Sequence, residues 1–283
     1  MSPIRRIAFK SWLVVLVVVF GLGFFGLTSL VIGWFADVEG VAGPVTDLGY
    51  GALIGIILTS GLVVQLRAPQ DKIAGIQQAA LVIPALVMGS AVASDGQDLV
   101  SALIVTVAVG GLLALHPARG EFLSKGSSIS PALLAITILG AIPLISYALE
   151  MGAQARDLEG PPHHVQRLST MAAMAIAIVL VGMLAAMKTR GWRIPAWSAG
   201  AAAITFGLAT LAFTDNPGAP GSGWGMLAVG GGVLFIAAAE REARRTKPTQ
   251  KAVGANLHGS RIGCRPTGRA GTQGTSDVPD IDE

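Results

Sequence analysis

The stretch that decides the fold is LSTMAAMAIAIVLVGMLAAM at residues 168–187, which is followed at once by KTRGWR at residues 188–193. The first segment carries no charged residue, and about 20 apolar residues are enough for an α-helix to cross the hydrocarbon core of a bilayer. The basic residues after it are typical of the cytoplasmic end of such a helix. The stretch therefore predicts a transmembrane helix, and seven other segments of the chain resemble it.

The whole chain has the composition of a membrane protein. Of its 283 residues, 52% are hydrophobic and 13% are charged, whereas about 25% of the residues in a soluble domain are charged. We predict an all-α integral membrane protein with eight transmembrane helices, the last of which is short unless it begins near residue 221. The predicted spans are residues 11–35, 48–66, 73–93, 99–115, 129–151, 168–187, 196–213 and 225–239.

The charges outside the spans predict the orientation. Of the 20 Lys and Arg residues, 18 lie in the termini or in alternate gaps between spans, and only Arg156 and Arg167 lie in the other gaps. Those other gaps carry acidic residues, among them Asp47, Asp95 and Asp215. By the positive-inside rule, both termini and the basic gaps are cytoplasmic. We therefore expect a multi-pass protein of the cell membrane, whose basic residues set the topology and bind no nucleic acid.

The two halves of the chain share a pattern at an offset of 120 residues. DVEG at residues 37–40 corresponds to DLEG at 157–160, SD at 94–95 corresponds to TD at 214–215, and AVGG at 108–111 recurs at 228–231. Each pair occupies the same place relative to the spans. Because each half has an even number of spans, we predict two parallel four-helix repeats related by an axis along the membrane normal. The alternative is coincidence in a chain rich in Gly, Ala and Val.

This organisation divides the chain into a first repeat at residues 1–120, a second repeat at residues 121–240 and a tail at residues 241–283. The tail begins with basic residues, continues with a stretch rich in Gly, Thr and Arg, and ends with acidic residues. Such a segment cannot bury enough apolar area to offset its loss of chain entropy. We expect a disordered cytoplasmic tail whose basic part contacts anionic lipid.

The acidic gaps contain the candidate site residues. No Lys or Arg lies in the middle of a span, and the only acidic residue that we place near a membrane core is Glu150. This argues against a proton pump or a voltage sensor. The carboxylates on the outer side are candidates for binding a substrate or a cation, and a second interpretation gives the Asp-x-Glu-Gly segments a structural role as helix caps and turns. These carboxylates are Asp37, Glu39, Glu150, Asp157 and Glu159.

Two adjacent histidines in the same outer gap suggest a metal. His163 and His164 follow the rigid Pro161-Pro162 pair and lie close in sequence to Asp157 and Glu159. Carboxylates and neutral imidazoles together suit zinc, manganese or iron. We therefore name His163 and His164 as candidate ligands of a divalent metal, and no other cofactor is indicated.

Three classes of function stay open. The sequence contains no Ser-His-Asp set, no glycine-rich phosphate loop and no paired-cysteine motif, so the common enzyme signatures are missing. The leading hypothesis is a protein that handles a small solute or cation at a pseudo-two-fold site near the outer face. The first alternative is a non-catalytic scaffold or accessory subunit, with a membrane partner or as a homo-oligomer. The second is a metal-dependent membrane enzyme that uses the outer acidic and histidine-bearing loop.

Overall fold

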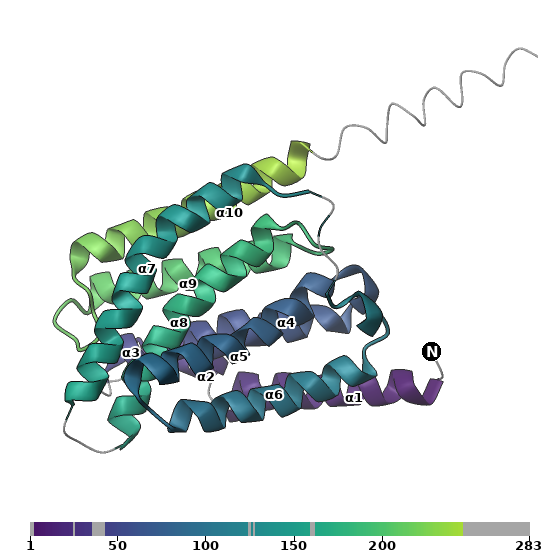
Figure 1. The fold of residues 1–283 in the computed structure, drawn as a ribbon, viewed down its shortest axis with the longest axis horizontal. Helices are drawn as coiled ribbons and strands as arrows, with labels where there is room; N and C mark the ends of the chain where they lie inside the picture. Colours follow the sequence, from purple (N-terminus) through teal and green to yellow (C-terminus); the bar gives the residue numbers. More distant parts are fainter. Residues whose placement is uncertain are drawn as a thin grey trace, which may run out of the picture. The chain divides into compact units, whose positions relative to one another are not determined.

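The computed structural model describes residues 3–24, 26–35, 43–123, 126, 128–158 and 162–245, and every regular element in these ranges is helical (Figure 1). The chain divides into a unit that ends at Ala243 and a second that begins at Arg244. The predicted tail lies outside the described residues from position 246 onward, as do Asp37, Glu39 and Glu159. The α-helices are α1 Pro3–Val18, α2 Gly26–Ile32, α3 Pro44–Gly51, α4 Ser60–Val63, α5 Ile73–Ala93, α6 Gln97–Leu115, α7 Pro131–Asp157, α8 Pro162–Ala186, α9 Arg193–Ala212 and α10 Ser222–Arg245.

Short segments of other helix types join or extend these helices. Two π-helical segments continue the first and second spans, one 3₁₀ turn ends the second span, and two more 3₁₀ turns lie in the connections after the second and fourth spans. They are η1 Val19–Gly23, η2 Ala52–Thr59, η3 Val64–Leu66, η4 Pro69–Asp71 and η5 Arg119–Glu121.

Eight helical stretches in the described chain are long and apolar enough to cross a membrane, as predicted. The boundaries differ in an informative way. The eighth span begins at Ser222 and so has full length, and the fourth begins at Gln97, which places Asp98 inside a helix. The spans are Pro3–Ile32, Pro44–Leu66, Ile73–Ala93, Gln97–Leu115, Pro131–Asp157, His163–Ala186, Arg193–Ala212 and Ser222–Arg245.

Burial separates four inner spans from four outer ones. In the most apolar window of α8, 89% of the residues are buried, against 22% for α7 and for α10. The second, third and seventh spans are also half buried or more, whereas the first and fourth are mostly exposed. α8 is packed against α5 and α7 and also contacts α3, α6 and α9. The inner spans therefore form the core, and the outer spans present their apolar side chains outward, as lipid contact requires.

Small residues allow the close helix packing that membrane proteins use in place of a hydrophobic drive. A Cβ atom added to Gly55 would lie 2.4 Å from the carbonyl oxygen of Gly26, so these two backbones are in direct contact. A Cβ added to Gly89 on α5 would lie 2.8 Å from the carbonyl oxygen of Ser169 on α8. The second of these contacts holds α5 and α8 together near the start of α6.

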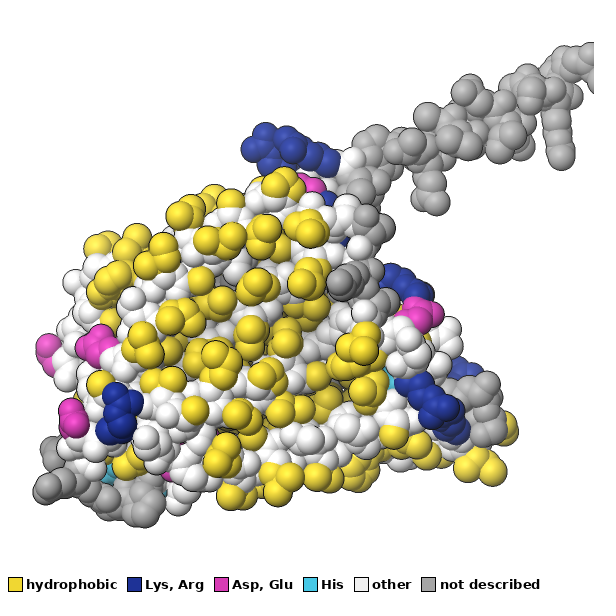
Figure 2. All heavy atoms as spheres, viewed as in Figure 1, with side chains coloured by type: hydrophobic (Ala, Val, Ile, Leu, Met, Phe, Trp, Pro, Cys, Tyr) yellow, Lys and Arg dark blue, Asp and Glu magenta, His cyan; other side chains and the backbone are white. Residues whose placement is uncertain are grey.

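The two ends of the spans differ in charge. We call the end with Asp47, Asp95 and Asp157 the acidic end, and the opposite end, with residues 188–193, the basic end. On the face in Figure 2, hydrophobic side chains cover the middle and charged side chains gather toward the two ends. Three ion pairs tie the basic end together: Lys188–Glu242, Arg193–Glu240 and Arg190–Glu121.

Candidate functional site

The predicted site residues are spread over the acidic end. Glu150 and Asp157 are exposed on the last turns of α7, and His163 and His164 lie on the first turn of α8 with their ring centroids 4.4 Å apart. Among the described residues, no three His, Cys, Asp or Glu side chains are grouped so that they could hold a metal ion. The metal site therefore stays a prediction, because Glu159 lies outside the described residues.

A different acidic residue occupies the interior. Asp98, in the first turn of α6, is 1% exposed and therefore lies in the interior of the described bundle, whereas Glu150 is exposed. Ser169 Oγ on α8 donates a hydrogen bond of 2.6 Å to Asp98 Oδ2, and Thr170 Oγ1 donates one of 3.2 Å to Oδ1. The carboxylate is thus held between α6 and α8 by neutral hydroxyl groups.

A second buried carboxylate lies close to it in the chain. Asp95 is 7% exposed, and its Oδ1 accepts a hydrogen bond of 3.0 Å from the backbone N–H of Gln97. Its Oδ2 is buried and has no hydrogen-bond partner within the described chain. Burying a charge is costly unless it is paired. Within the described chain, the hydrogen-bond donors that reach the two carboxylates are neutral, and neither carboxylate forms an ion pair.

A small void adjoins Asp98. It has a volume of about 30 Å³, and Tyr50, Ser101 and Thr170 line it together with Asp98. A water molecule needs about 10 to 15 Å³ of such space. The void is therefore large enough for one water molecule or one small cation. Its apolar wall is made by Phe20, Phe24, Ile54, Leu86, Ile104 and Val105.

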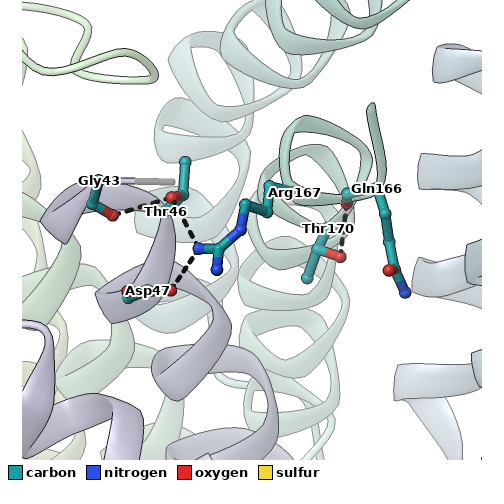
Figure 3. A network of polar contacts seen from close by, with 6 residues as sticks. All are labelled: Gly43, Thr46, Asp47, Gln166, Arg167 and Thr170. Carbon is teal, nitrogen blue, oxygen red and sulfur yellow. Dashed lines mark hydrogen bonds and ion pairs between the residues drawn. The ribbon is translucent and has the colours of Figure 1, made fainter. Parts of the chain in front are cut away.

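The arginine closest in sequence to Ser169 and Thr170 is engaged elsewhere. Arg167, on α8, forms an ion pair with Asp47 on α3, and its Nη1 also donates a hydrogen bond of 3.4 Å to Thr46 Oγ1 (Figure 3). One turn further along α8, the Thr170 hydroxyl also lies 2.9 Å from the carbonyl oxygen of Gln166 (Figure 3), so its single proton is shared between Gln166 and Asp98. Arg167 thus bridges α3 and α8, and leaves Asp98 to hydroxyl donors.

A larger cavity lies among α7, α8, α9 and α10. Its volume is about 330 Å³, and its wall is mostly apolar. Gly140 and Pro143 line it on α7, Phe206 on α9, and Trp224 and Phe235 on α10. At the acidic end, Glu150 lies at its edge and Tyr147 OH donates a hydrogen bond of 2.7 Å to the carbonyl oxygen of Gly218.

Polar side chains also meet inside the bundle toward the basic end. Ser60 Oγ lies 2.9 Å from Ser198 Oγ and accepts a hydrogen bond of 3.1 Å from Gln78 Nε2. Closer to the end of the spans, His116 Nε2 lies 3.2 Å from Gln65 Oε1, and His116 Nδ1 accepts from the backbone N–H of Ala118. His116 is 1% exposed, and this burial lowers its pKa below the usual value of 6.5.

Asp98 is not among the site residues predicted from the sequence, which does not reveal its burial. The signal was weak, because Asp98 stands one residue before a predicted span and its partners Ser169 and Thr170 lie far away in the sequence. No family model, curated protein or solved structure matches this chain. The function of the chain must therefore be inferred from the geometry of its described residues.

Proposed function

We propose that this chain is a multi-pass membrane protein that binds a small cation, a proton or a monovalent metal ion, at Asp98 near the acidic end. The observation that carries the proposal is the Asp98 carboxylate, buried inside a membrane span, held by hydroxyl groups and adjacent to a void of ionic size. Ionisable groups inside spans are expensive and mark ion paths or proton relays when they occur. Asp95, with its unpartnered buried oxygen in the described chain, adds a second negative charge.

We further propose that the protein consists of two parallel four-helix repeats. Two residues that a two-fold axis exchanges with each other can be in contact only if both lie next to that axis. Two contacts join residues that are 120 positions apart, which is the offset predicted from the sequence: Asp47 with Arg167 at the acidic end, and the Gln70 carbonyl oxygen with Arg190 Nη1 at 3.4 Å at the basic end. An axis through both contacts would run along the spans.

Backbone geometry and packing support the same repeat. Ala68 and Lys188, again 120 positions apart, both have a positive φ, of 50° and 49°, which is uncommon for residues other than glycine. Each lies where an inner span has ended. Span three packs against span six, and span two packs against span seven, as a two-fold axis requires. Superposition of residues 131–239 on 11–119 in an experimental structure tests the repeat. A best fit that pairs other helices would contradict it.

We propose that the protein lies in the cell membrane with its basic end and both termini on the cytoplasmic side. The support is the distribution of basic residues, which continues into Arg241, Arg244 and Arg245 on α10, where contact with anionic lipid would be favourable. Gly96 at the acidic end and Gly120 at the basic end both have open space around an added Cβ. In a variant lacking Cys264, an impermeant maleimide applied to intact cells should label Gly96→Cys and spare Gly120→Cys. The opposite labelling would reverse the topology.

Cation binding is tested by melting the purified protein in detergent at constant ionic strength. We expect Li⁺, Na⁺, K⁺ or a change of pH to shift the melting temperature, since a ligand at 100 times its Kd stabilises by about 2.7 kcal/mol. Asp98→Asn should remove the shift while it keeps the shape of the side chain. Asp157→Asn, at an exposed carboxylate on α7, is the matched control and should retain the shift.

The scaffold interpretation makes the opposite prediction for the same experiment. An acidic side chain in the first turn of a helix is stabilised by the helix dipole, and Asp98 occupies such a position on α6. If neither ions nor pH shift the melting temperature through Asp98, then Asp98 is structural, and the role as scaffold or accessory subunit, with a membrane partner or as a homo-oligomer, is favoured. Metal bound in stoichiometric amount through His163 and His164 would favour the membrane enzyme.

A further inference from the structure

The cavity in the second half opens sideways between apolar side chains. Leu139 on α7 and Leu227 and Leu234 on α10 line it, and their side chains are 68%, 64% and 57% exposed. Side chains that line the cavity and are also exposed on the outer surface of the protein form the rim of its opening. Because these residues belong to membrane spans, the opening faces the hydrocarbon of the bilayer. The cavity is therefore accessible to a hydrocarbon chain from the surrounding lipid.

One end of this cavity carries a negative charge. Glu150 lines it on the last part of α7, and Pro220 and Trp224 line it near the same end. Within the described chain, the Glu150 carboxylate accepts a hydrogen bond of 3.4 Å from Gln154 and forms no ion pair. Tryptophan is typical of the interface between hydrocarbon and headgroups. The charge thus lies at headgroup level and the apolar lining at the level of the acyl chains.

We propose that the cavity binds a membrane phospholipid with a primary amine headgroup, one acyl chain of which enters between α7 and α10 while the ammonium group pairs with Glu150. The volume of about 330 Å³ lies at the lower end of ligand pockets, about 300 to 1,000 Å³, and suits part of one chain rather than a whole lipid. The Glu150 carboxylate can accept hydrogen bonds from a primary ammonium group, whereas the quaternary ammonium of phosphatidylcholine has no N–H to donate. This inference does not rest on the proposed cation site, which lies on other helices.

The position of Gly140 gives a way to close the cavity. Gly140 lines it, and a Cβ added there would meet nothing within 4 Å. Phe20, which precedes Gly140 by the repeat offset, is 2% exposed and lines the small void in the first half. Gly140→Phe should therefore fill the cavity of the second half without forcing the backbone. Gly230, on α10, also has open space around an added Cβ but is not part of the lining, so Gly230→Phe is the matched control.

Quenching of Trp224 fluorescence reports on occupation of this cavity. Trp224 is retained as the only tryptophan by changing Trp12, Trp34, Trp192 and Trp197 to Phe, and circular dichroism checks the helical content of each variant. The protein is reconstituted in phosphatidylcholine vesicles with rising fractions of phosphatidylethanolamine that carries brominated acyl chains. We expect phosphatidylethanolamine to be preferred at Trp224 by about fivefold, the size of one partly exposed ion pair.

The variants separate the headgroup from the chain. Glu150→Gln should retain the quenching of Trp224 by brominated chains but lose the preference for phosphatidylethanolamine. Gly140→Phe should lose this preference and also lower the quenching of Trp224. Gly230→Phe should change neither quantity. The proposal is overturned if the unmodified protein shows no preference, or if anionic phosphatidylglycerol is preferred. It is also overturned if Gly140→Phe keeps the preference, because the lipid would then bind the outer surface and not the cavity. None of these results depends on whether Asp98 binds a cation.

Discussion

The two pockets of the protein differ in size and character, and the proposed repeat relates one to the other. The void beside Asp98 has about 30 Å³ and the cavity beside Glu150 about 330 Å³. At the proposed offset of 120 residues, Phe20 corresponds to Gly140, and Asp98 corresponds to Gly218. An aromatic ring and a carboxylate fill the first pocket, whereas the second has a glycine on α7 and a backbone carbonyl held by Tyr147. One scaffold can therefore present a small polar site in one half and a large apolar site in the other.

The largest effect is expected from opening the first pocket. Phe20 is buried and stacks on Phe24 with ring centroids 5.5 Å apart. Phe20→Ala should lower the free energy of unfolding by about 3 to 5 kcal/mol, because the lost side chain leaves a cavity. Unfolding in mixed micelles with a denaturing detergent measures this. Gly140→Phe, the reciprocal change, should stay within about 0.5 kcal/mol of the parent. Equal costs for the two changes would remove the distinction between a filled and an open pocket.

A smaller effect is expected from the wall behind the first pocket. Gly89 on α5 contacts the backbone of α8 at Ser169, the residue that donates to Asp98, whereas the proposed offset of 120 residues pairs Gly89 with Ala209. Gly89→Leu should cost about 1 to 3 kcal/mol through overpacking, measured in the same unfolding assay. Gly110→Leu, where an added Cβ meets no other atom, should be close to neutral. A neutral Gly89→Leu would mean that α5 and α8 are not in direct contact.

The third effect concerns the edge of the second cavity. Tyr147→Phe removes the hydroxyl that donates to the Gly218 carbonyl oxygen, and should cost about 0.5 to 1.5 kcal/mol. Tyr50→Phe is the control, since the structure gives no hydrogen bond for the Tyr50 hydroxyl in the described chain. If the control costs as much as Tyr147→Phe, the loss does not come from the bond to Gly218.

The smallest effect is expected at the basic end, where the proposed offset of 120 residues pairs His116 with Ile236. Burial lowers the pKa of His116 in the folded protein, so the unfolded chain binds the proton first as the pH falls. The stability that neutral His116 contributes is therefore complete above about pH 6.5 and declines as the pH falls below it. The melting temperature should therefore fall between pH 8 and pH 5, and His116→Gln should reduce this dependence of the melting temperature on pH. His163 is exposed, so His163→Gln is the control and should leave the pH dependence of the melting temperature unchanged. If that dependence persists in His116→Gln, another titrating group causes it.

The sequence predicted the spans well because hydropathy and the basic residues that interrupt it are properties of the chain itself. Only residues near the ends of spans were misjudged. The predicted fourth span, residues 99–115, leaves Asp98 outside, yet α6 begins at Gln97, so Asp98 belongs to the first turn of the helix. The sequence cannot reveal such burial, because it depends on Ser169 and Thr170 arriving from α8.

The large cavity could not be predicted from the sequence either. Gly140 and Pro143 could be read from the sequence as weak points of a helix, but the empty volume beside them depends on what α8, α9 and α10 place opposite. The predicted roles of Asp37, Glu39 and Glu159 remain predictions, because those residues lie outside the described chain. Periodicity and charge therefore define the spans, whereas the sites depend on which side chains from distant helices meet.

The central position of α8 has a consequence for how the protein is made. The main neighbours of α8 are α7, which precedes it in the second half, and α5, which belongs to the first. While the ribosome has delivered only the first half, α5 lacks the helix that covers its small-residue face at Gly89. We therefore expect the first half, synthesised alone, to remain loosely packed in the membrane and to become resistant to proteolysis only after α8 has been inserted. Assembly in the membrane would then be completed late, in a single step shared by both halves.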